Sequence, residues 1–322
     1  MQFTRLGDPE LADIAATFEL GALRSARPIA AGTINSNFAV TTERGPWFVR
    51  VNEGKAEADV AWEAQLVAAL ADGGVATPPP VRARDGRPYA ALAGTAKFVS
   101  VFPWRAGRHL APDEVTPAAA GEFGAALASI HQVGLDLPVA WRRRSIYDHA
   151  HLVARFARFA DATDPVLAPA IAVLRDELAA AGAATAVRER AGHGIIHGDL
   201  FRDNVLWDAG RLVAILDFEQ ASGGSFAYDL AVCLNDWCWD GAVRLDLATA
   251  LLAGYQRVRA LTAADRDALV IEVKAAAARF TVTRITDVYL AKVDNPDKDF
   301  RAFLARCHAW QGSILGQLSA LV

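Results

Sequence analysis

The sequence contains few of the residues that build disulfide frameworks or zinc sites. Among 322 residues there are three cysteines, Cys233, Cys238 and Cys307. Three unevenly spaced thiols cannot form a set of paired disulfides, and they are too few for the four ligands of a structural zinc ion. We therefore expect all three to be buried thiols that pack as small apolar side chains.

The chain also lacks an excess of positive charge and a long apolar run. Its 33 Lys and Arg are outnumbered by 37 Asp and Glu, whereas a nucleic-acid-binding surface requires a concentration of basic residues. No apolar stretch approaches the roughly 20 residues that span a bilayer, and the acidic first 20 residues do not have the pattern of a secretory signal. We expect no nucleic-acid partner, no membrane segment and a cytoplasmic location.

What the sequence does have is the length and patterning of a two-lobed α+β protein. A single hydrophobic core stops growing at about 250 to 300 residues, and this chain has 322. Alternating apolar residues predict antiparallel strands early in the chain, with a hairpin over residues 27–53, and helical spacing predicts a helix over 57–71. Helical patterns dominate from Pro112 onward. We predict a small β-rich lobe over residues 1–101 and a larger, mainly helical lobe over 102–322.

The densest polar cluster is His197-Gly198-Asp199, with Asn204 five residues after Asp199 and Asp217 at the end of an apolar run. Phosphoryl transfer requires a carboxylate that orients the attacking hydroxyl and accepts its proton. It also requires oxygen ligands for the magnesium ion that bridges the phosphates. Asp199 suits the first role, and Asn204 and Asp217 suit the second. The pattern therefore indicates a phosphotransferase.

The same residues form a motif known from kinases. H-G-D-x-x-x-x-N followed by L-D-F resembles the catalytic loop and metal-binding aspartate of the protein-kinase-like aminoglycoside and choline phosphotransferases. The resemblance implies a protein-kinase-like fold, ATP and Mg²⁺ as cofactors, and a His197 that packs beneath the catalytic loop. We expect Asp229, at a predicted helix start, to bind backbone amides or the catalytic loop.

In the N-terminal lobe, A-A-G-T-I-N-S-N-F lies where this family keeps its phosphate-covering loop. Gly32 would allow the backbone to approach a phosphate closely, and Asn35, Ser36 and Asn37 offer donors or turn-forming side chains. A hairpin turn that binds no nucleotide would have a similar sequence. The resemblance implies that this lobe holds the nucleotide.

Arg50 in F-V-R-V lies where many of these kinases place a phosphate-pairing lysine, and Glu63 on the following helix can pair with it. Arginine replaces lysine here, which favours a bidentate grip on phosphate oxygens. Lys55 is a competing candidate, but its turn-like segment N-E-G-K predicts a solvent-exposed side chain. Glu219 is interpreted either as a second carboxylate near the metal or as a structural residue.

Several longer segments resemble bacterial homoserine kinases of this fold more than its antibiotic-modifying members. They occur in one order over nearly the whole chain and are AAGTINSNF, DGRPYAALAG, HGDLFRDNVLW, YDLAVCLNDWCWD, LLAGYQRVRALTAADRDAL and AARFTVTRITDVY. The sequence departs from these kinases at LDFEQASGGS, where they carry more aromatic residues. The resemblance implies phosphorylation of the side-chain hydroxyl of L-homoserine, a step of threonine biosynthesis.

The acceptor L-homoserine carries a carboxylate, an ammonium group and a primary hydroxyl. Arg279 and Arg284 lie on an apolar helical segment near Asp287, and these side chains offer partners for the carboxylate and the ammonium group. The same three residues could instead serve only to join helices. Asn235 and Asp236 are further candidates for the acceptor pocket.

Other functions remain open at the level of sequence. An aminoglycoside would favour several acidic groups around the acceptor, and choline would favour an aromatic cage, to which Trp237 and Trp239 could contribute. Another amino alcohol is a further possible acceptor, whereas a protein serine is disfavoured because no activation segment follows Asp217. A non-catalytic nucleotide-binding regulator would not need the three residues Asp199, Asn204 and Asp217. We predict an ATP-dependent small-molecule kinase, monomeric or homodimeric, with homoserine as the favoured substrate.

Overall fold

The computed structural model describes residues 4–29 and 35–321 and divides the chain into two compact units. Unit 1 comprises the chain up to Arg108 together with Val213–Glu219, and unit 2 comprises His109–Leu212 and the chain from Gln220 onward. The sequence predicted one division after residue 101. In the structure, residues 102–108 and the distant segment that carries Asp217 also belong to unit 1.

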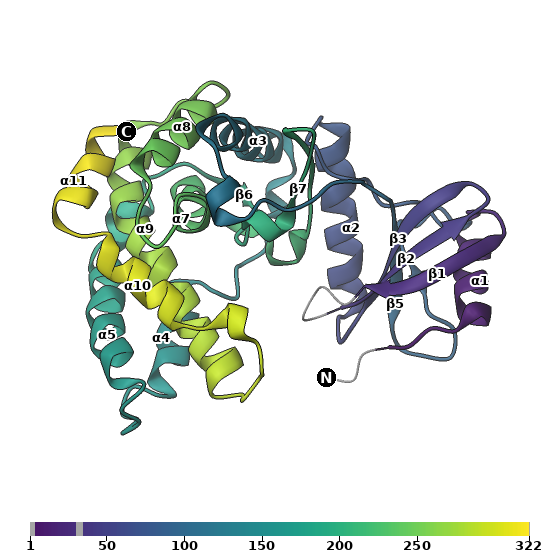
Figure 1. Cartoon of the computed structure of the whole chain (residues 1–322), viewed down its shortest axis with the longest axis horizontal. Coiled ribbons are helices and arrows are strands. Elements are labelled where there is room, and N and C mark those ends of the chain that lie inside the picture. Colours follow the sequence, from purple (N-terminus) through teal and green to yellow (C-terminus); the bar gives the residue numbers. More distant parts are fainter. Residues whose placement is uncertain (1–3, 30–34, 322) are drawn as a thin grey trace. The chain divides into compact units, whose positions relative to one another are not determined.

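Unit 1 contains an antiparallel sheet of five strands in the order β1-β2-β3-β5-β4 (Figure 1). Its elements are α1 (Asp8–Thr17), β1 (Leu23–Ile29), β2 (Ser36–Thr42), β3 (Gly45–Asn52), α2 (Glu57–Asp72), β4 (Ala90–Ala91) and β5 (Phe98–Pro103). The predicted hairpin corresponds to the β2–β3 pair, and the predicted helix corresponds to α2.

The two faces of this sheet have different neighbours because successive side chains of a strand point to opposite sides. Val49 and Val51 of β3 are fully buried in an apolar cluster with Leu11 and Ile14 of α1. Arg50, between them in sequence, points to the other face, where its guanidinium meets Glu63 of α2. Because side chains alternate along β3, the Arg50 guanidinium lies on the face of the sheet that carries α2.

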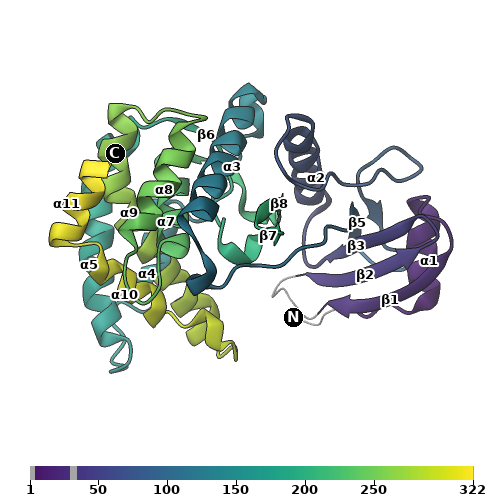
Figure 2. The ribbon, with the colours of Figure 1, turned by 45° about the horizontal axis from the view of Figure 1, so that its top comes forward.

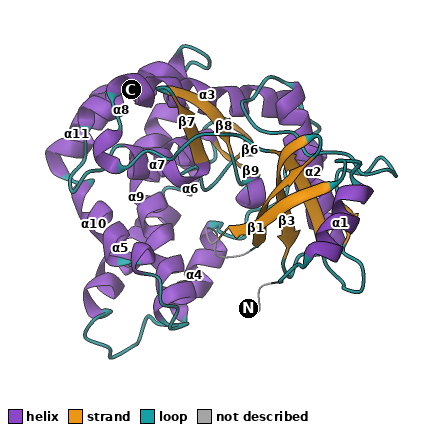
Figure 3. Ribbon diagram, turned by 45° about the vertical axis from the view of Figure 1, so that its right-hand side comes forward, coloured by secondary structure: helices purple, strands orange, loops and turns teal. Residues whose placement is uncertain are grey.

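Unit 2 is mainly helical, as the colouring by secondary structure shows (Figure 3). Its longer elements are α3 (Pro117–Asp136), α4 (His149–Ala157), α5 (Ala168–Ala183), α6 (Thr185–Arg188), β6 (His193–Ile196), β7 (Val205–Asp208), β9 (Ser222–Ser225), α7 (Phe226–Trp237), α8 (Leu245–Gln256), α9 (Ala263–Arg284), α10 (Arg301–Ala309) and α11 (Gly312–Leu321). Short 3₁₀ turns of this unit lie at Pro112–Glu114, Val139–Trp141, Arg202–Asn204 and Pro296–Lys298, and one π-helical turn lies at Ile285–Tyr289. A further 3₁₀ turn, Phe218–Gln220, begins in the segment that belongs to unit 1. β7 and β8 (Arg211–Ile215) form a separate two-stranded sheet.

The sequence did not predict β9, which pairs antiparallel with β6. Its sequence, Ser-Gly-Gly-Ser, has a low propensity for strands. The glycines are required by the packing, because a Cβ atom on Gly224 would lie 2.3 Å from the Ile196 side chain. β9 forms because it packs and pairs with β6, so its own sequence has no alternating apolar pattern from which it could be predicted.

Helical spacing predicts a helix over residues 145–161, and the structure forms a shorter one, α4. It begins after Asp148, whose side chain caps it by accepting a hydrogen bond from the amide of His151 at 3.0 Å, and it ends at Ala157. The expectation about thiols is confirmed, because all three cysteines are free and buried. In the described part of the chain, no helix has both the length and the apolar character needed to cross a membrane.

Helices α3 and α8 pack side by side through glycines (Figure 2). A Cβ atom on Gly254 would lie 2.0 Å from the carbonyl oxygen of Gly121, and one on Gly124 would lie 2.1 Å from that of Leu251. In both cases the obstacle is backbone, which cannot move aside as a flexible side chain can. The two helices therefore approach as closely as their main chains allow.

We expect Gly254→Ala to lower the free energy of unfolding by about 3 kcal/mol, because the added methyl group forces these two backbones apart. The matched control is Gly316→Ala in α11, where no atom lies within 4 Å of the added Cβ. That control should raise the stability by about 0.5 to 1 kcal/mol, because alanine is the better helix former. Urea unfolding curves measure both values, and equal effects at the two positions would contradict the close contact.

Candidate active site

Arg50 is the centre of a charged cluster in unit 1. Its side chain is 11 % exposed, and Nη1 lies 2.8 Å from Glu63 Oε1 and 3.7 Å from Glu219 Oε1, while Nη2 lies 3.9 Å from Asp217 Oδ1. Burial alone would lower the pKa of Arg50, but Glu63, Asp217 and Glu219 raise it above its ordinary value. The predicted Arg50–Glu63 pair is therefore present, and Arg50 remains charged.

Lys55 belongs to the same cluster, which corrects the expectation that it would be exposed. Its side chain is 16 % exposed, and Nζ lies 2.9 Å from Glu63 Oε2 and 2.8 Å from Glu219 Oε1. The turn at Glu53 and Gly54, where φ of Gly54 is 65°, leads the chain directly into α2. Lys55 thus lies beside the first turns of that helix, within reach of Glu63. Two cations and two buried carboxylates alternate in this cluster, so both interpretations of Glu219 are compatible with its position.

The residues predicted for the phosphate-covering loop are only partly described. Gly32 lies outside the described residues. Asn35 donates from its side-chain nitrogen to Glu219 and accepts from the backbone amide of Glu53 at 3.2 Å, while the Ser36 hydroxyl donates to Glu53 Oε1 at 2.6 Å. Asn37 is the β2 residue opposite Arg50 of β3. Ser36 and Asn37 are therefore strand residues at the mouth of the loop, next to the charged cluster.

Asp217 has a backbone conformation that is uncommon for a residue with a side chain. Its φ is 62°, in the left-handed region, and such strain is concentrated at functional sites. The preceding strand is fixed within unit 1 by a hydrogen bond of 2.6 Å from the Ile215 amide to the Ala76 carbonyl. The carboxylate is 45 % exposed, so it is available to a ligand.

The catalytic loop of unit 2 holds Asp199 and Asn204 together. The side-chain nitrogen of Asn204 donates to the Asp199 carbonyl oxygen at 2.8 Å. This hydrogen bond fixes the orientation of the amide and leaves its oxygen for another partner. The Asp199 carboxylate is one-third exposed and accepts a hydrogen bond of 3.2 Å from Arg279 Nη1. The loop presents a carboxylate and an amide oxygen from adjacent positions.

Asp229 of α7 binds the backbone of this loop. Its carboxylate accepts hydrogen bonds from the backbone amides of His197 at 2.8 Å and Gly198 at 2.7 Å. The contact predicted for Asp229 is therefore present. His197 itself is fully buried, in agreement with its expected position beneath the loop.

The sequence did not predict the partners of Asp229 on its other side. His131 Nε2 lies 3.0 Å from Asp229 Oδ2, and His131 Nδ1 lies 2.7 Å from the Tyr255 hydroxyl. Burial lowers the pKa of His131 despite the neighbouring carboxylate, so the imidazole is neutral at pH 7. It donates to Asp229 and accepts from Tyr255. A helix face that carries a histidine among apolar residues was the only signal in the sequence.

Arg279 of α9 is 3 % exposed and lies between aromatic rings. Its guanidinium carbon is 4.0 Å from the centre of the Tyr147 ring and 3.7 Å from that of Phe280. Such rings attract a cation and fix its plane. Since this guanidinium already pairs with Asp199, Arg279 positions the carboxylate and neutralises it.

The other predicted acceptor residues lie at separate places in unit 2. Arg284, at the end of α9, donates to the carbonyl oxygen of Asp299 at 3.0 Å. Asp287 is exposed and pairs with Arg155 of α4 at 2.7 Å. The structure therefore does not bring Asp287 into contact with Arg279 or Arg284. Its substrate role stays a prediction.

Asn235 and Asp236 lie at the end of α7. The Asn235 side chain is buried, donates to the carbonyl oxygens of Ala231 and Val273, and accepts from the indole of Trp310. Asp236 forms a bidentate pair with Arg202 at 3.0 and 3.2 Å. These contacts are structural, and the substrate role of the two residues also stays a prediction.

The aromatic cage considered for choline is not formed by Trp237. Its side chain is 1 % exposed and stacks on Phe123 with ring centres 3.8 Å apart. Trp239 lies instead against the guanidinium of Arg306 at 4.7 Å. Trp237 is therefore a core residue.

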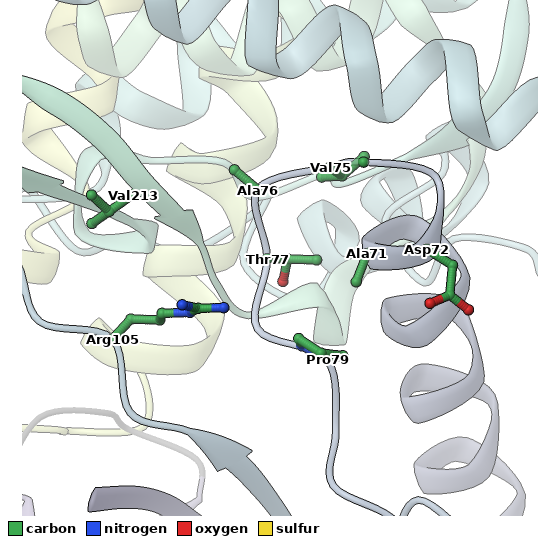
Figure 4. Close-up of a pocket in the computed structure, with 9 residues that line it drawn as sticks. Ala71, Asp72, Val75, Ala76, Thr77, Pro79, Arg105 and Val213 are labelled. Atoms are coloured by element: carbon green, nitrogen blue, oxygen red, sulfur yellow. The ribbon is translucent and has the colours of Figure 1, made fainter.

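A hollow of about 420 Å³ lies within unit 1 at the end of α2 (Figure 4). Asp72, Thr77, Arg105 and Val213 contribute to its wall. None of the residues predicted to bind nucleotide, metal or acceptor lines this hollow.

The donor chemistry at Asn204 and Asp217 fits the magnesium ion that the fold family implies. One carboxylate and one amide oxygen are ligands of the kind that Mg²⁺ takes, with its other positions filled by water and substrate phosphates. In the described part of the chain, no group of three or more His, Cys, Asp or Glu side chains is placed to hold a metal ion without such help.

Comparison with known proteins gives the family. The family model described as "Phosphotransferase enzyme family" matches residues 25–261. A homoserine kinase of Methylobacterium radiotolerans is 37% identical, and the match covers 88% of this chain and 87% of that protein. A homoserine kinase of Parvibaculum lavamentivorans is 33% identical over 96% of both chains.

Solved structures show the same fold at lower identity. An amicoumacin kinase in complex with AMP-PNP, Ca²⁺ and Ami has a TM-score of 0.69 at 16% identity, over 96% of this chain and 92% of that one. A choline/ethanolamine kinase family protein of Mesorhizobium loti has a TM-score of 0.69 at 20% identity, over 98% and 99%. With its antiparallel N-terminal sheet, helical second unit and kinase motifs, the chain belongs to the phosphotransferase enzyme family and is a relative of the bacterial homoserine kinases.

Proposed function

We propose that this protein transfers the γ-phosphoryl group of ATP to the side-chain hydroxyl of L-homoserine. One observation carries the choice of acceptor: relatives that match nearly the whole chain at 33% to 37% identity are homoserine kinases. The charged clusters around Arg50 and Asp199 support the class of reaction. They supply the carboxylate, oxygen ligands and cations that phosphoryl transfer needs.

In the proposed reaction, Asp199 accepts the proton of the homoserine hydroxyl while its oxygen forms a bond to the γ-phosphorus. The bond between that phosphorus and the β–γ bridging oxygen breaks, and ADP leaves. Asn204 and Asp217 would hold Mg²⁺, which neutralises charge on the phosphates when it is bound. Arg50 contacts the phosphates, and Glu63 orients Arg50 through their 2.8 Å pair.

The two lobes have separate roles in this proposal. Residues 1–101 hold the nucleotide, with Asn35, Ser36 and Asn37 at the end of the phosphate-covering loop that includes Gly32. Residues 102–322 supply the base and the acceptor pocket. The chemistry requires no covalent enzyme intermediate, and a cytoplasmic location, where ATP and free amino acids occur, remains our prediction.

The test is an ADP-release assay with magnesium-ATP and a panel of acceptors: L-homoserine, L-threonine, L-serine, choline, ethanolamine and kanamycin. We expect the highest kcat/KM with L-homoserine, because unit 2 contains the buried Arg279 and Arg306 and the half-buried Arg284, cations that suit a carboxylate. Choline and kanamycin have no carboxylate and should be the poorest acceptors. Faster turnover with one of them would replace homoserine but keep the kinase. Nucleotide binding without turnover on any acceptor would favour a regulatory protein.

A further inference from the structure

Unit 2 contains one buried arginine, Arg306, and one half-buried arginine, Arg284, whose charges are not neutralised by an ion pair. Arg202 is paired with Asp236, and Arg279 is paired with Asp199. Arg284 and Arg306, in contrast, form no ion pair with any carboxylate of the described residues, and their hydrogen bonds go to backbone carbonyl oxygens. Arg306 is 6 % exposed. Uncompensated cations at this depth are uncommon, because burying a charge without a partner is costly.

The two guanidinium groups lie at one place. The guanidinium carbon of Arg284 is 4.5 Å from the centre of the Phe303 ring, and that of Arg306 is 4.4 Å from the same centre. The distance between the two guanidinium carbons therefore cannot exceed the sum of these two values. Trp239 covers the other side of Arg306 at 4.7 Å. An aromatic surface of this kind holds arginines in fixed planes, with N–H groups directed along the edge.

Electrostatics at this cluster favours an anion. Burial lowers the pKa of Arg306 to about 10, and the positive charges of Arg284 and Arg202 act in the same direction, while Asp236 opposes them. Burial also lowers the pKa of Arg284, against the opposing charges of Asp236, Asp199, Asp203 and Asp299. Of these four carboxylates, Asp236 is already engaged by Arg202, Asp199 by Arg279 and Asp299 by Arg301, and Asp203 is close enough to act on Arg284 but forms no ion pair with it. One bound anion would relieve the repulsion between the arginines.

The cluster adjoins the base. Phe303 stacks on Phe201 with ring centres 5.7 Å apart, and Phe201 follows Asp199 by two residues in the catalytic loop. Phe280, which carries Arg279 on its face, lies 4.8 Å from Phe303. Asp199 is near enough to oppose the fall in the pKa of Arg284. An acceptor whose hydroxyl is at Asp199 could therefore place a second group at the arginines.

We propose that Arg284 and Arg306 form the subsite for the α-carboxylate of the acceptor, with Phe303 as its floor. The inference rests on the proposed function, since it identifies which part of the amino acid unit 2 recognises. It also gives the arginines different roles, because Arg279 positions the base, whereas Arg284 and Arg306 select acceptors that carry a carboxylate. Arg284 retains N–H groups beyond its one backbone hydrogen bond, and Arg306 retains those on Nη2, so a bidentate carboxylate has donors on both.

The experiment compares L-homoserine with 3-amino-1-propanol, which is the same molecule with hydrogen in place of the carboxylate. The variants are Arg284→Gln, Arg306→Gln and Arg306→Lys, with Arg301→Gln as the control. Arg301 is on the same helix as Arg306, but its side chain is 56% exposed and pairs with Asp299. Because Arg306 also binds two backbone carbonyl oxygens, Arg284→Gln is the cleaner variant, and unfolding curves identify any loss of fold.

We expect Arg284→Gln and Arg306→Gln each to lower kcat/KM for L-homoserine by about 10- to 100-fold, as loss of a charge-assisted hydrogen bond predicts. The value for 3-amino-1-propanol should change by less than about threefold, and so should the KM for ATP. An unchanged KM for ATP separates an acceptor carboxylate from a phosphate as the anion. Arg306→Lys keeps the charge and should fall between wild type and Arg306→Gln, while Arg301→Gln should match wild type.

Equal losses with both acceptors would overturn the subsite and leave the two arginines as structural residues. So would a wild-type enzyme that uses 3-amino-1-propanol as well as L-homoserine. Calorimetric titration of L-homoserine, with AMP-PNP present, separates this inference from the proposed function. Binding that Arg284→Gln weakens, without turnover in wild type, would refute the kinase reaction and keep the subsite, whereas no binding by wild type would refute both.

Discussion

Asp199→Asn is expected to slow phosphoryl transfer by about a hundred- to ten-thousand-fold, which is the usual contribution of a positioned general base. The amide has nearly the same shape as the carboxylate but cannot accept the proton of the attacking hydroxyl. The Asn204 side chain donates its hydrogen bond to the backbone carbonyl oxygen of residue 199, which the substitution does not change, so this hydrogen bond should persist. Binding of ATP should therefore remain within about threefold of wild type.

The variant has a second effect that must be measured separately. Asp199 neutralises the buried guanidinium of Arg279 at 3.2 Å, and the amide leaves that charge without a counterion. Because Asp199 is one-third exposed, solvent screening reduces the loss, and we expect a decrease in stability of about 1 to 2 kcal/mol. Turnover must therefore be compared at a temperature where both proteins are fully folded.

Asp208→Asn is the matched control for Asp199→Asn. Asp208 is exposed at the end of β7, nine residues from Asp199 in the chain. Its amide variant changes the net charge equally and should keep wild-type turnover. Single-turnover kinetics with the best acceptor, together with calorimetric ATP binding, give the two quantities needed. Turnover of Asp199→Asn within about threefold of wild type would remove Asp199 as the base.

Features governed by short spacing were predictable from the sequence. Asp199 and Asn204 are five residues apart, so one loop must hold both, and the structure shows the hydrogen bond between them. Arg50 and Glu63 lie on a strand and the next helix, and their ion pair follows from that order. Both pairs join residues that are close in the chain, so the sequence motif was enough to predict each contact.

Contacts across a long stretch of chain were not predictable. Arg279 reaches Asp199 from 80 residues away, and His131 reaches Asp229 from 98 residues away. The helical period shows that such residues lie on a helix, but the choice of partner depends on how α3, α7 and α9 pack. The sequence therefore predicted Arg279 as a site residue without revealing that its partner is Asp199.

The polar residues at the end of α7 also show that the sequence does not reveal the partner of a buried polar side chain. Asn235 and Asp236 were candidates for the acceptor pocket. In the structure Asn235 joins α7 to Val273 and Trp310, and Asp236 holds Arg202 of the catalytic loop. A buried polar group has to be satisfied by some partner, and periodicity does not reveal whether that partner is a ligand or the protein itself.

The second large effect is expected at Asp229, which touches no reacting group. Both of its oxygens accept backbone amides of the catalytic loop, and His131 donates to one of them. In Asp229→Asn one oxygen becomes an N–H donor that faces the N–H of His197 or Gly198. We expect kcat to fall by about 100-fold, because a shift of the loop by roughly 1 Å is enough for a loss of that size. The unpaired amide should lower the stability by about 1 to 3 kcal/mol.

The pH dependence of stability gives an independent check on this carboxylate. Burial raises the pKa of Asp229, but the hydrogen bonds from the His131 side chain and from the His197 backbone amide bring it below the ordinary value. A carboxyl group with a lowered pKa stabilises the fold above its unfolded pKa of about 3.9, and this contribution is lost as the pH falls through the folded pKa. The amide that replaces it in Asp229→Asn does not titrate. The difference in stability between wild type and Asp229→Asn should therefore be constant near neutral pH and narrow below about pH 4.

Asp265→Asn is the matched control that distinguishes a role of Asp229 in positioning the catalytic loop from a general loss of stability. Asp265 is a fully buried carboxylate that accepts the backbone amides of Gly192 at 2.7 Å and Thr262 at 3.0 Å, outside the catalytic loop. Its variant should lose a similar amount of stability, but at a temperature where it is folded it should keep kcat within about threefold of wild type. Urea unfolding and steady-state kinetics on both variants make the comparison. If Asp265→Asn loses as much kcat as Asp229→Asn, the effect at Asp229 is one of stability, and the carboxylate has no special role in holding the catalytic loop.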